Sequence, residues 1–391
     1  MSGFSQPNQL DAFAVTAPGL EPLCAAELNA IGIAATAQDG GAAWSGDIGS
    51  IARANLWSRT ASRVIVRLGE FRARTFFELE RNAKRLPWDG FIAPAGGVAF
   101  RVTSRKSKLY HSDAVAQRLA EAALRHVSGV RVEHATSDDD DSDTPEHPAQ
   151  LFVVRVLHDV VTVSADSSGA LLHFRGYRQQ LAKAPLRETL AAALLLGADW
   201  AGDVPLLDPM CGSGTIPIEA ARLARRIAPG RDRSFAFARW PRFDVRRWRA
   251  LLEQAREQEL PTSPVAIAGA DRDAGAVAAA RANAERAGVA GDIELVEAPI
   301  SAMPADHGAG LIATNPPYGV RIGETDRLRN LYAQLGNVLR TKRPRWRLAM
   351  LSADKTLERQ LKLPLEEKLR TRNGGIAVRL VTARLPEPSR P

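Results

Sequence analysis

From Leu206 onward, short apolar runs alternate with helical stretches, and this pattern constrains the fold more than any other feature of the chain. Runs with the length of buried strands occur at 205–210, 265–273, 292–298, 310–319, 347–352 and 375–384, and helical periodicity occurs at 216–227, 274–288 and 328–340. Short strands that are each followed by a helix indicate an α/β fold. We therefore expect a doubly wound, mostly parallel sheet that binds ligands at the carboxyl ends of its strands.

A glycine-containing turn joins the first of these strands to its helix, in the run LLDPMCGSGTIPIEAA. Asp208 ends the strand, Gly212 and Gly214 allow a ligand to approach the backbone closely, and the start of the helix offers unpaired N–H groups. Pro217 stands where a dinucleotide-binding GxGxxG motif needs its last glycine, and no lysine matches the GxxxxGK[ST] motif. A dinucleotide enzyme and a P-loop nucleotidase are therefore disfavoured.

The second strand of this region ends in Asp271, within VAIAGADRDAGAVAAARANA. A carboxylate at this position in a doubly wound sheet can accept hydrogen bonds from both hydroxyls of a ribose. The alternative is an acid that only lies near a helix start, since Asp273 suits an N-cap. Together with the glycine loop, Asp271 favours a nucleoside-binding site.

The segment LIATNPPYGVRIGE carries the most specific motif. Pro316 and Pro317 fix the backbone and remove two N–H donors, so nearby carbonyl groups are held as acceptors. Asn315 adds a side-chain oxygen and Tyr318 adds a flat ring, which together suit a primary amine on a stacked nucleobase. The alternative is a proline-rich turn after a strand.

The residues before 167 predict a smaller α+β region. Strand-like runs occur at 11–17, 61–71, 96–104 and 151–167, and helical stretches occur at 20–32, 76–86 and 108–127. Gly32 is a plausible stop for the first helix, and Ser112 or Asp113 is the expected N-cap of the last. We expect domain boundaries near residues 60 and 166.

Charge points to a polyanionic partner. The run SDDDDSDTPEH at 137–147 contains six acids and no Lys or Arg, and we expect it to be a solvated, mobile insertion. The whole chain has a formal net charge of +8, so the remainder without this run carries +14. A strongly basic chain of this kind suits a nucleic acid.

The first residues, the apolar runs and the cysteines do not indicate a membrane protein or a metal site. The run from Leu190 to Ala198 is the longest apolar stretch and is far shorter than a bilayer span, and the first residues lack a signal-peptide pattern. Cys24 and Cys211 fit neither a zinc-ligand spacing nor a disulfide framework. We expect a cytoplasmic protein without a metal site.

The motifs DPMCGSGTIPIEAA and TNPPYG, with the strand of Asp271 between them, resemble class I S-adenosylmethionine-dependent methyltransferases that modify exocyclic amines. The run FRVTSRKSKLYHSDAVAQRLAEAAL resembles a THUMP RNA-binding domain. The run HFRGYRQQLAKAPLRETLAAALLLGADW resembles the segment that follows this domain in bacterial 23S rRNA guanine-N2 methyltransferases. The resemblance covers nearly the whole chain and implies a Rossmann-like methyltransferase domain at 167–391, a THUMP-like domain at 61–166 and a ferredoxin-like unit at 1–60.

The resemblance also implies a cofactor, S-adenosyl-L-methionine, and roles for individual residues. The glycine loop would hold its methionine part, Asp271 its ribose, and the NPPY segment the target amine. The implied cofactor-binding residues are Asp208, Cys211, Gly212, Gly214, Thr215 and Asp271, and the implied catalytic residues are Asn315, Pro316, Pro317 and Tyr318.

One part of the family pattern is missing. Family members usually carry an acid after the third strand that receives the adenine amino group, and Ala298-Pro299-Ile300 stands there instead. Backbone groups or Asp306 are the candidate substitutes. Cys211 is also explained as a small packing residue.

Two basic regions are candidates for RNA contact. Arg101, Lys106 and Lys108 lie in the THUMP-like region. Residues 222–249 carry ten Arg and two Asp together with Phe235, Phe237, Trp240, Phe243 and Trp248, a mixture that suits phosphate neutralisation and base stacking. The alternative for this second region is an Arg-rich surface over a small aromatic cluster.

Three functions stay open from the sequence. The first is a methyltransferase acting on guanine N2 in RNA, with 23S rRNA as the substrate. The second has the same chemistry on a tRNA guanine or on adenine N6 in RNA or DNA, because NPPY recognises an amine rather than a ring. The third is a non-catalytic RNA-binding assembly protein, which only the missing third-strand acid supports.

Overall fold

The computed structural model describes residues 9–133, 149–178, 186–306, 308–318 and 325–385. The acidic run 137–147 lies outside these residues. The chain divides into two compact units: Met1–Thr16, Cys24–Leu172 and Arg233–Leu252 form the first, and Ala17–Leu23, His173–Asp232 and Glu253–Pro391 form the second. No helix among the described residues is long and apolar enough to cross a membrane.

The first unit contains one mixed sheet, whose described strands follow the order β2-β3-β1-β4-β8-β7-β5-β6. The strands are β1 (Leu10–Val15), β2 (Thr36–Gln38), β3 (Gly41–Gly46), β4 (Arg63–Arg72), β5 (Gly97–Arg105), β6 (Arg131–Glu133), β7 (Ala149–Leu157) and β8 (Val160–Asp166). The helices are α2 (Ile48–Trp57), α3 (Phe76–Ala83) and α4 (Ser112–Leu124), and α1 (Glu21–Ala30) has its last seven residues here. Because β1 pairs with β4, the residues before and after position 60 share this sheet.

Two local expectations in this unit were wrong. The stretch 151–167 is a hairpin of two antiparallel strands, because His158 and Asp159 adopt φ values of 52° and 63° that reverse the chain in a tight turn. The N-cap of α4 is His111, so Ser112 is already helical. Gly32 ends α1 as expected, with a φ of 78° that favours glycine.

Residues 233–252 complete the core of the first unit. Phe235, Phe237 and Trp240 are buried among side chains from the sheet and α3–α4 region, and Trp240 packs edge-on against Phe91 at 4.9 Å between ring centroids. The Trp240 indole also donates to Gln150 Oε1 at 2.8 Å. The expectation that these three aromatic rings stack on RNA bases was therefore wrong, because a buried ring has no face to offer.

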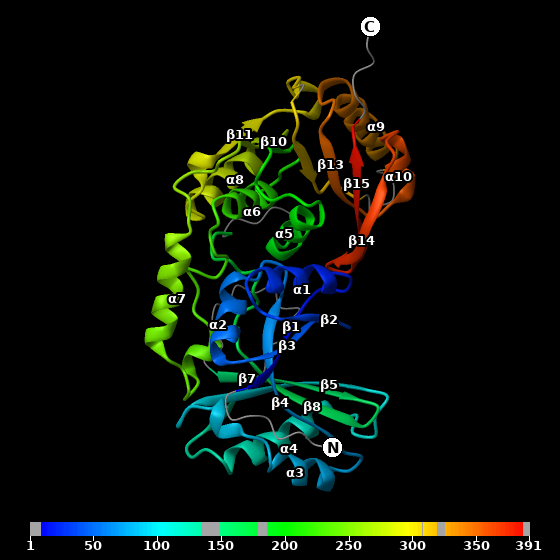
Figure 1. Cartoon of the computed structure of the whole chain (residues 1–391). Helices are drawn as coiled ribbons and strands as arrows, with labels where there is room; N and C mark the ends of the chain where they lie inside the picture. The colour runs from blue at the N-terminus through cyan, green and yellow to red at the C-terminus, as the bar shows by residue number, and fades with distance from the viewer. Residues whose placement is uncertain (1–8, 134–148, 179–185, 307, 319–324, 386–391) are drawn as a thin grey trace. The chain divides into compact units, whose positions relative to one another are not determined.

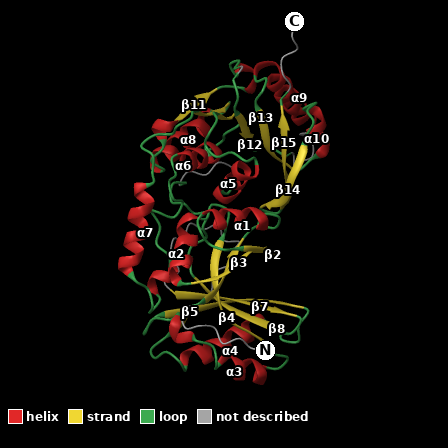
Figure 2. Cartoon of the chain, viewed as in Figure 1, coloured by secondary structure: helices red, strands yellow, loops and turns green. Residues whose placement is uncertain are grey.

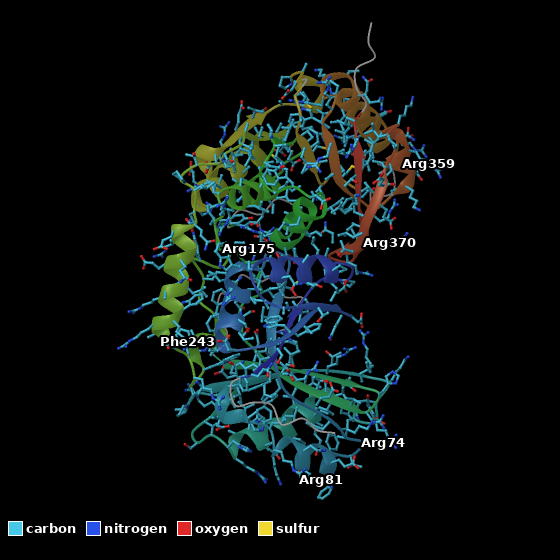
Figure 3. The ribbon with its side chains drawn as sticks, viewed as in Figure 1. Arg74, Arg81, Arg175, Phe243, Arg359 and Arg370 are labelled. Atoms are coloured by element: carbon cyan, nitrogen blue, oxygen red, sulfur yellow. The ribbon has the colours of Figure 1, made fainter. Side chains whose placement is uncertain are left out.

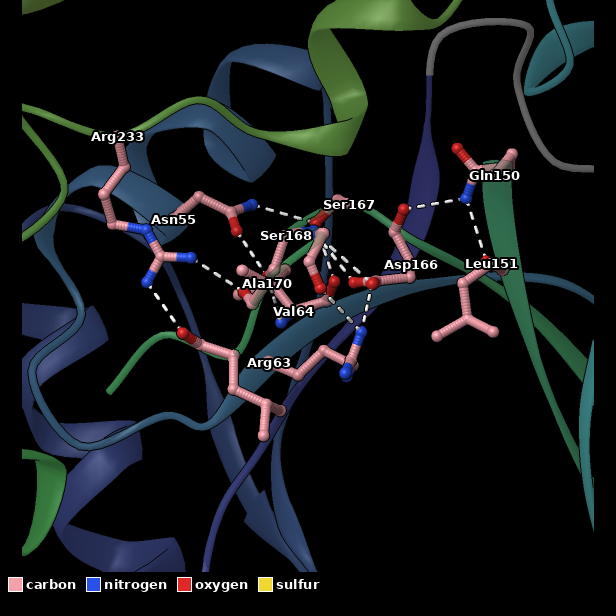
Figure 4. Close-up of polar contacts among 12 residues, drawn as sticks. Asn55, Arg63, Val64, Gln150, Leu151, Asp166, Ser167, Ser168, Ala170 and Arg233 are labelled. Atoms are coloured by element: carbon pink, nitrogen blue, oxygen red, sulfur yellow. Dashed lines mark hydrogen bonds and ion pairs between the residues drawn. The ribbon is translucent and has the colours of Figure 1, made fainter. Parts of the chain in front are cut away.

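A buried polar network supports this core (Figure 4). Asp166 pairs with Arg63 and accepts the backbone N–H groups of Ser168 at 2.9 Å and Gly169 at 3.1 Å. Ser168 Oγ donates to Asn55 Oδ1 at 2.6 Å, which connects α2 to the end of β8. Burial raises the pKa of Asp166 against the opposing effect of Arg63. The network supplies the hydrogen-bond partners that polar groups need when they are buried in a protein core.

The second unit is the expected doubly wound sheet, with described strands in the order β11-β10-β9-β12-β13-β15-β14. The strands are β9 (Leu206–Asp208), β10 (Ile267–Asp271), β11 (Ile293–Glu297), β12 (Leu311–Thr314), β13 (Arg347–Ser352), β14 (Glu366–Asn373) and β15 (Ile376–Arg384). The strands from β11 to β13 are parallel, whereas β15 runs antiparallel to both of its neighbours.

Helices cover both faces of this sheet (Figures 1 and 2). On one face pack α5 (Glu188–Gly197), α6 (Thr215–Ala224) and α8 (Ala274–Arg286), and on the other pack α9 (Thr325–Lys342) and α10 (Lys355–Gln360). The helix α7 (Val245–Glu257) precedes β10. Since the strand order reverses between β9 and β12, their carboxyl ends mark the edge at which such folds bind ligands.

Candidate functional site

The polar residues singled out in the sequence meet at the carboxyl edge of the second unit's sheet. Asp208 ends β9, Asp271 ends the neighbouring β10, and Asn315 follows β12 on the other side of β9. Thr314, the last residue of β12, donates from Oγ1 to Asp208 Oδ1 at 2.8 Å. The strand ends that lead into the glycine loop and into the NPPY segment are therefore hydrogen-bonded to each other.

The two glycines of the loop are needed for different physical reasons. Gly214 is the N-cap of α6 with a φ of 85°, and a Cβ atom there would lie 2.9 Å from the Cβ of Ala280, so its role is close packing against α8. Gly212 has a φ of 53°, and a Cβ atom there would meet open space. The backbone at Gly212 is thus the part of the loop that a ligand can approach.

Buried side chains contact the glycine loop on its side toward the core. Asn283, on α8, donates to the Ser213 carbonyl at 3.0 Å, and the sequence analysis did not identify this residue. Thr215 and Cys211 are buried, and burial raises the pKa of the Cys211 thiol. A neutral, enclosed thiol fits the interpretation of Cys211 as a packing residue.

Asp271 and the neighbouring helix cap Asp273 accept hydrogen bonds from different backbone groups. Its Oδ2 atom accepts the Gly212 N–H at 3.0 Å and its Oδ1 atom accepts the Asp273 N–H at 3.0 Å, and the side chain stays partly exposed. Asp273 caps α8 by accepting from Gly275 N at 2.8 Å and Ala276 N at 3.2 Å. Asp273 therefore accounts for the helix start, and the Asp271 carboxylate faces the loop.

Asp208 is a structural acid of the site. It is 1% exposed and accepts the Met210 N–H at 3.1 Å in addition to the Thr314 hydroxyl. Burial raises the pKa of Asp208 to about 7, and the nearby charge of Asp271 adds to this effect. These contacts place Asp208 beneath the loop, where it orients the backbone.

The NPPY segment carries a hydrogen-bonded chain of side chains. The Tyr318 hydroxyl donates to Asn315 Oδ1, and Asn373 Nδ2, at the end of β14, donates to the Tyr318 hydroxyl at 3.4 Å. Tyr332, on α9, donates to the Pro317 carbonyl at 3.3 Å. Burial raises the pKa of Tyr318 to about 12, so its hydroxyl stays a donor at neutral pH.

Asn373 and Tyr332 were missed by the sequence analysis. Asn373 lies in the run RNGG, a hairpin-turn signal that predicts the turn but not its contact with Tyr318. Pro316 is buried while Pro317 is exposed, so the two prolines have different surroundings.

Asp306, the acid in the region after β11, has protein partners for both of its carboxylate oxygens. Its Oδ2 atom pairs with Arg343 at 3.0 Å and its Oδ1 atom accepts the Gly308 N–H at 2.8 Å. These contacts do not favour Asp306 as the adenine acceptor. Ala298 N donates to the Asp271 carbonyl at 2.9 Å, which places this backbone against the end of β10. Glu297 pairs in register with Asp271 and is exposed.

The structure separates the three basic residues expected to contact RNA. Lys106 and Lys108 are exposed in the turn beyond β5, and Lys106 has a φ of 50°. Arg101 lies within β5 and is partly buried. Phe100 and Val102 belong to the core that contains α4, so the alternation of the strand puts Arg101 on the opposite face. No cluster of metal-ligating side chains occurs within the described part of the chain.

Comparisons with known proteins show the family to which the chain is related. Residues 175–382 match the family model described as RMKL-like, methyltransferase domain, and residues 11–65 match that of the RlmL ferredoxin-like domain. The ribosomal RNA large subunit methyltransferase K/L of Syntrophotalea carbinolica is 38% identical over 94% of this chain and 53% of its own length. The chain thus spans about half the length of that relative.

Two further proteins match along nearly their full length. A candidate RNA methyltransferase of Synechocystis is 33% identical, with 94% of this chain and 95% of the relative covered. The crystal structure of SMU.472, a candidate methyltransferase complexed with SAH, is 30% identical with a TM-score of 0.85, covering 98% of this chain and all of that chain.

Proposed function

Because the chain belongs to the RMKL-like methyltransferase family, we propose that it transfers a methyl group from S-adenosylmethionine to the exocyclic N2 amine of a guanine in RNA. We take 23S rRNA as the substrate and the cytoplasm as the place of reaction. The observation that carries the proposal is the meeting of the Gly212 backbone, the Asp271 carboxylate and the Asn315 side chain at one sheet edge.

The residues at this edge fit the cofactor. Open space beside Gly212 leaves room for the methionine part, and Asp271 offers carboxylate oxygens to the ribose hydroxyls. Asp208, Cys211, Gly214 and Thr215 shape the loop from beneath, as their burial and packing suggest. When bound, S-adenosylmethionine supplies an electrophilic methyl group on a sulfonium sulfur.

The NPPY segment would activate the amine by position. Asn315 Oδ1 and the Pro316 carbonyl accept the two N–H groups, which directs the nitrogen lone pair at the methyl carbon. With the cofactor bound, transfer would form an N–C bond as the C–S bond of the cofactor breaks. The electron pair of that bond would stay on sulfur, and the surplus proton would leave the nitrogen for solvent. Tyr318 would stack on the base while its hydroxyl, bonded to Asn315 Oδ1, fixes the direction of that acceptor.

The RNA substrate is supported by charge and by the names of relatives. The chain carries a net charge of +8, and the S. carbinolica and Synechocystis relatives are named for RNA methylation. We infer that residues 61–166 form the THUMP-like RNA-binding part, with Lys106 and Lys108 as exposed phosphate contacts. We infer that the catalytic part lies within 167–391, outside the segment 233–252 that completes the core of the first unit.

A methyl-transfer assay tests the proposal. The full chain is incubated with tritiated S-adenosylmethionine and, separately, with unmodified rRNA, tRNA or DNA, and the labelled product is digested to nucleosides. We expect label in rRNA as N2-methylguanosine. Label in N6-methyladenosine, or only in tRNA or DNA, would replace the proposed substrate, and a protein silent on all three that still binds RNA would favour an assembly role.

An Asn315→Ala variant separates chemistry from cofactor binding. It should lower the single-turnover methylation rate by about 10²-fold, the scale for losing one preorganised transition-state contact. Its affinity for S-adenosylhomocysteine should stay within about twofold of the wild type, since Asn315 bonds to Tyr318 rather than to the glycine loop. A wild-type rate would exclude the amine-holding role of Asn315.

A further inference from the structure

The two most exposed large apolar side chains of the described residues are aromatic and belong to the same unit. Phe77, on the first turn of α3, is 71% exposed, and Tyr110, two residues before α4, is 68% exposed. Neither ring contributes to the core, although such rings usually gain stability by burial. Packing among the described residues does not account for their positions.

One carboxylate brings these two rings to the same end of the first unit. Asp159, in the turn between β7 and β8, accepts the Lys108 N–H at 2.8 Å and pairs with Arg74 Nε at 3.0 Å. Phe77 follows Arg74 by three residues and Tyr110 follows Lys108 by two. Since an extended residue spans at most about 3.6 Å, each ring starts within roughly 11 Å of an Asp159 partner along the chain.

The contact between α3 and α4 supports the same placement. Arg118, on α4, pairs with Glu80, on α3, at 3.1 Å, and at the far ends of the helices His126 contacts the Lys84 carbonyl at 2.9 Å. These two contacts show that α3 and α4 lie side by side and that their chains run in the same direction. Their first turns, which carry or adjoin the two rings, therefore lie next to each other.

Positive charge surrounds the rings. Arg72, Arg74, Arg81, Arg105, Lys106 and Lys108 are exposed at this end, and Figure 3 shows Arg74 and Arg81 there. The Arg81 guanidinium lies over the Phe77 ring at 6.0 Å from its centroid. The nearby acids are Glu78, which accepts the Arg74 N–H at 2.7 Å, Glu80, which pairs with Arg118, Asp159, which is occupied as described, and the exposed Glu70 and Asp113.

We propose that Phe77 and Tyr110 form a stacking platform for unpaired bases of the RNA substrate, with the surrounding arginines and lysines holding the phosphates. Exposed aromatic rings within a cationic surface are how proteins bind single-stranded nucleic acid without reading its sequence. Paired bases inside a duplex present no free face to such rings. The platform rests on the proposed RNA substrate and adds that a single-stranded segment is recognised away from the methylation site.

Binding measurements on the full chain test this platform. The probes are a single-stranded RNA dodecamer and a duplex of equal length, and the variants are Phe77→Ala and Tyr110→Ala. Each variant should weaken binding of the single strand by roughly 5- to 150-fold, the range for losing one stacked base, and leave duplex binding within about twofold. Phe77→Tyr keeps an aromatic ring and should bind the single strand as tightly as the wild type. Val132→Ala removes another exposed apolar side chain and should leave single-strand affinity unchanged.

The salt dependence separates stacking from charge. Removal of a ring should lower affinity equally at every salt concentration, whereas Lys106→Ala should reduce the slope of log affinity against log salt by about one. Single-strand affinity within twofold of wild type in both ring variants, or an equal loss on the duplex, would overturn the proposal. Because the oligonucleotide assay needs no methyl transfer, a chain inactive on rRNA that still loses single-strand binding would contradict the proposed function alone.

Discussion

At the scale of single residues, two aspartates two positions apart have different predicted roles: Asp271 in the proposed cofactor site and Asp273 as a helix cap. Asp271→Ala should weaken binding of S-adenosylhomocysteine by roughly 10- to 150-fold, because a charged hydrogen bond contributes about 1.5–3 kcal/mol. Asp273→Ala should instead lower the free energy of unfolding by about 1 kcal/mol, the usual effect of losing an N-cap, with affinity unchanged. Calorimetry and thermal melts of both variants decide the matter. Equal affinities would assign the ribose to another acid.

The buried carboxyl of Asp208 predicts a dependence of stability on pH. Its pKa is raised to about 7 in the folded protein from the ordinary value of about 4 for an aspartate, so folding takes up a proton between about pH 4 and pH 7. The free energy of unfolding contributed by this group is therefore highest below about pH 4 and falls as pH rises to about 7.

Asp208→Asn removes this titration and keeps an acceptor oxygen for Met210 and Thr314. The melting temperature of the variant relative to wild type should rise from pH 5 to pH 8. Glu188 and Asp166 also have a raised pKa, but both are present in the two proteins and their effects cancel. A difference that is constant with pH would show that Asp208 is charged throughout.

At the scale of elements, the β14–β15 hairpin acts on the NPPY segment through Asn373. Asn373→Ala removes the donor to the Tyr318 hydroxyl and should lower the methylation rate about 2- to 10-fold, the effect of one neutral hydrogen bond. Binding of S-adenosylhomocysteine should not change. Arg372→Ala is the matched control, because Arg372 contacts Gly375 within the same hairpin. Equal rates for Asn373→Ala and its control would remove Asn373 from the site.

The elements differ in how well the sequence predicts them. The strands β9, β10 and β12 are apolar runs that end in Asp208, Asp271 and the NPPY segment, so the strands and the doubly wound sheet to which they belong followed from the pattern. The strand β14 was missed because EEKLRTRN is a charged, largely exposed edge strand, and charge at a sheet edge prevents further pairing. Asn373 went unnoticed with it, since only the fold brings position 373 to position 318.

Composition also failed to separate burial from binding in the aromatic segment. Phe235, Phe237 and Trp240 lie among arginines in sequence, which equally suits a stacking surface and a core covered by charge. Whether these three rings are buried depends on the side chains that pack against them. One of these is Phe91, which contacts Trp240 and lies more than a hundred residues earlier in the chain. The exposed pair Phe77 and Tyr110 carried no such signal, because Phe77 follows the partly buried Phe76 in a helical pattern and Tyr110 stands just before one, and neither pattern shows which ring stays exposed.

At the scale of the whole molecule, the first unit is built from separated parts of the chain. A fragment of residues 1–172 lacks Phe235, Phe237 and Trp240, and loss of one buried aromatic side chain costs about 3–5 kcal/mol. Since domains are stable by only about 5–15 kcal/mol, we expect this fragment to bind a hydrophobic dye and to lack a cooperative melt.

A synthetic peptide of residues 233–252 should restore the cooperative melt when it is added to that fragment. The control peptide carries Trp240→Ala, which removes both the contact with Phe91 and the donor to Gln150, and should restore it only weakly. A fragment that melts cooperatively by itself, with no change on adding the peptide, would show that the segment is dispensable for the core.

The same separation imposes an order on biosynthesis. The stretch up to Leu172 leaves the ribosome 80 residues ahead of Leu252, which ends the first unit's last segment. At a translation rate of about 5–20 residues per second, the nascent first unit waits roughly 4–16 s with part of its apolar surface uncovered. During this interval the second unit is also unfinished, so we expect the growing chain to depend on chaperones that shield apolar surface until residue 252 has been made.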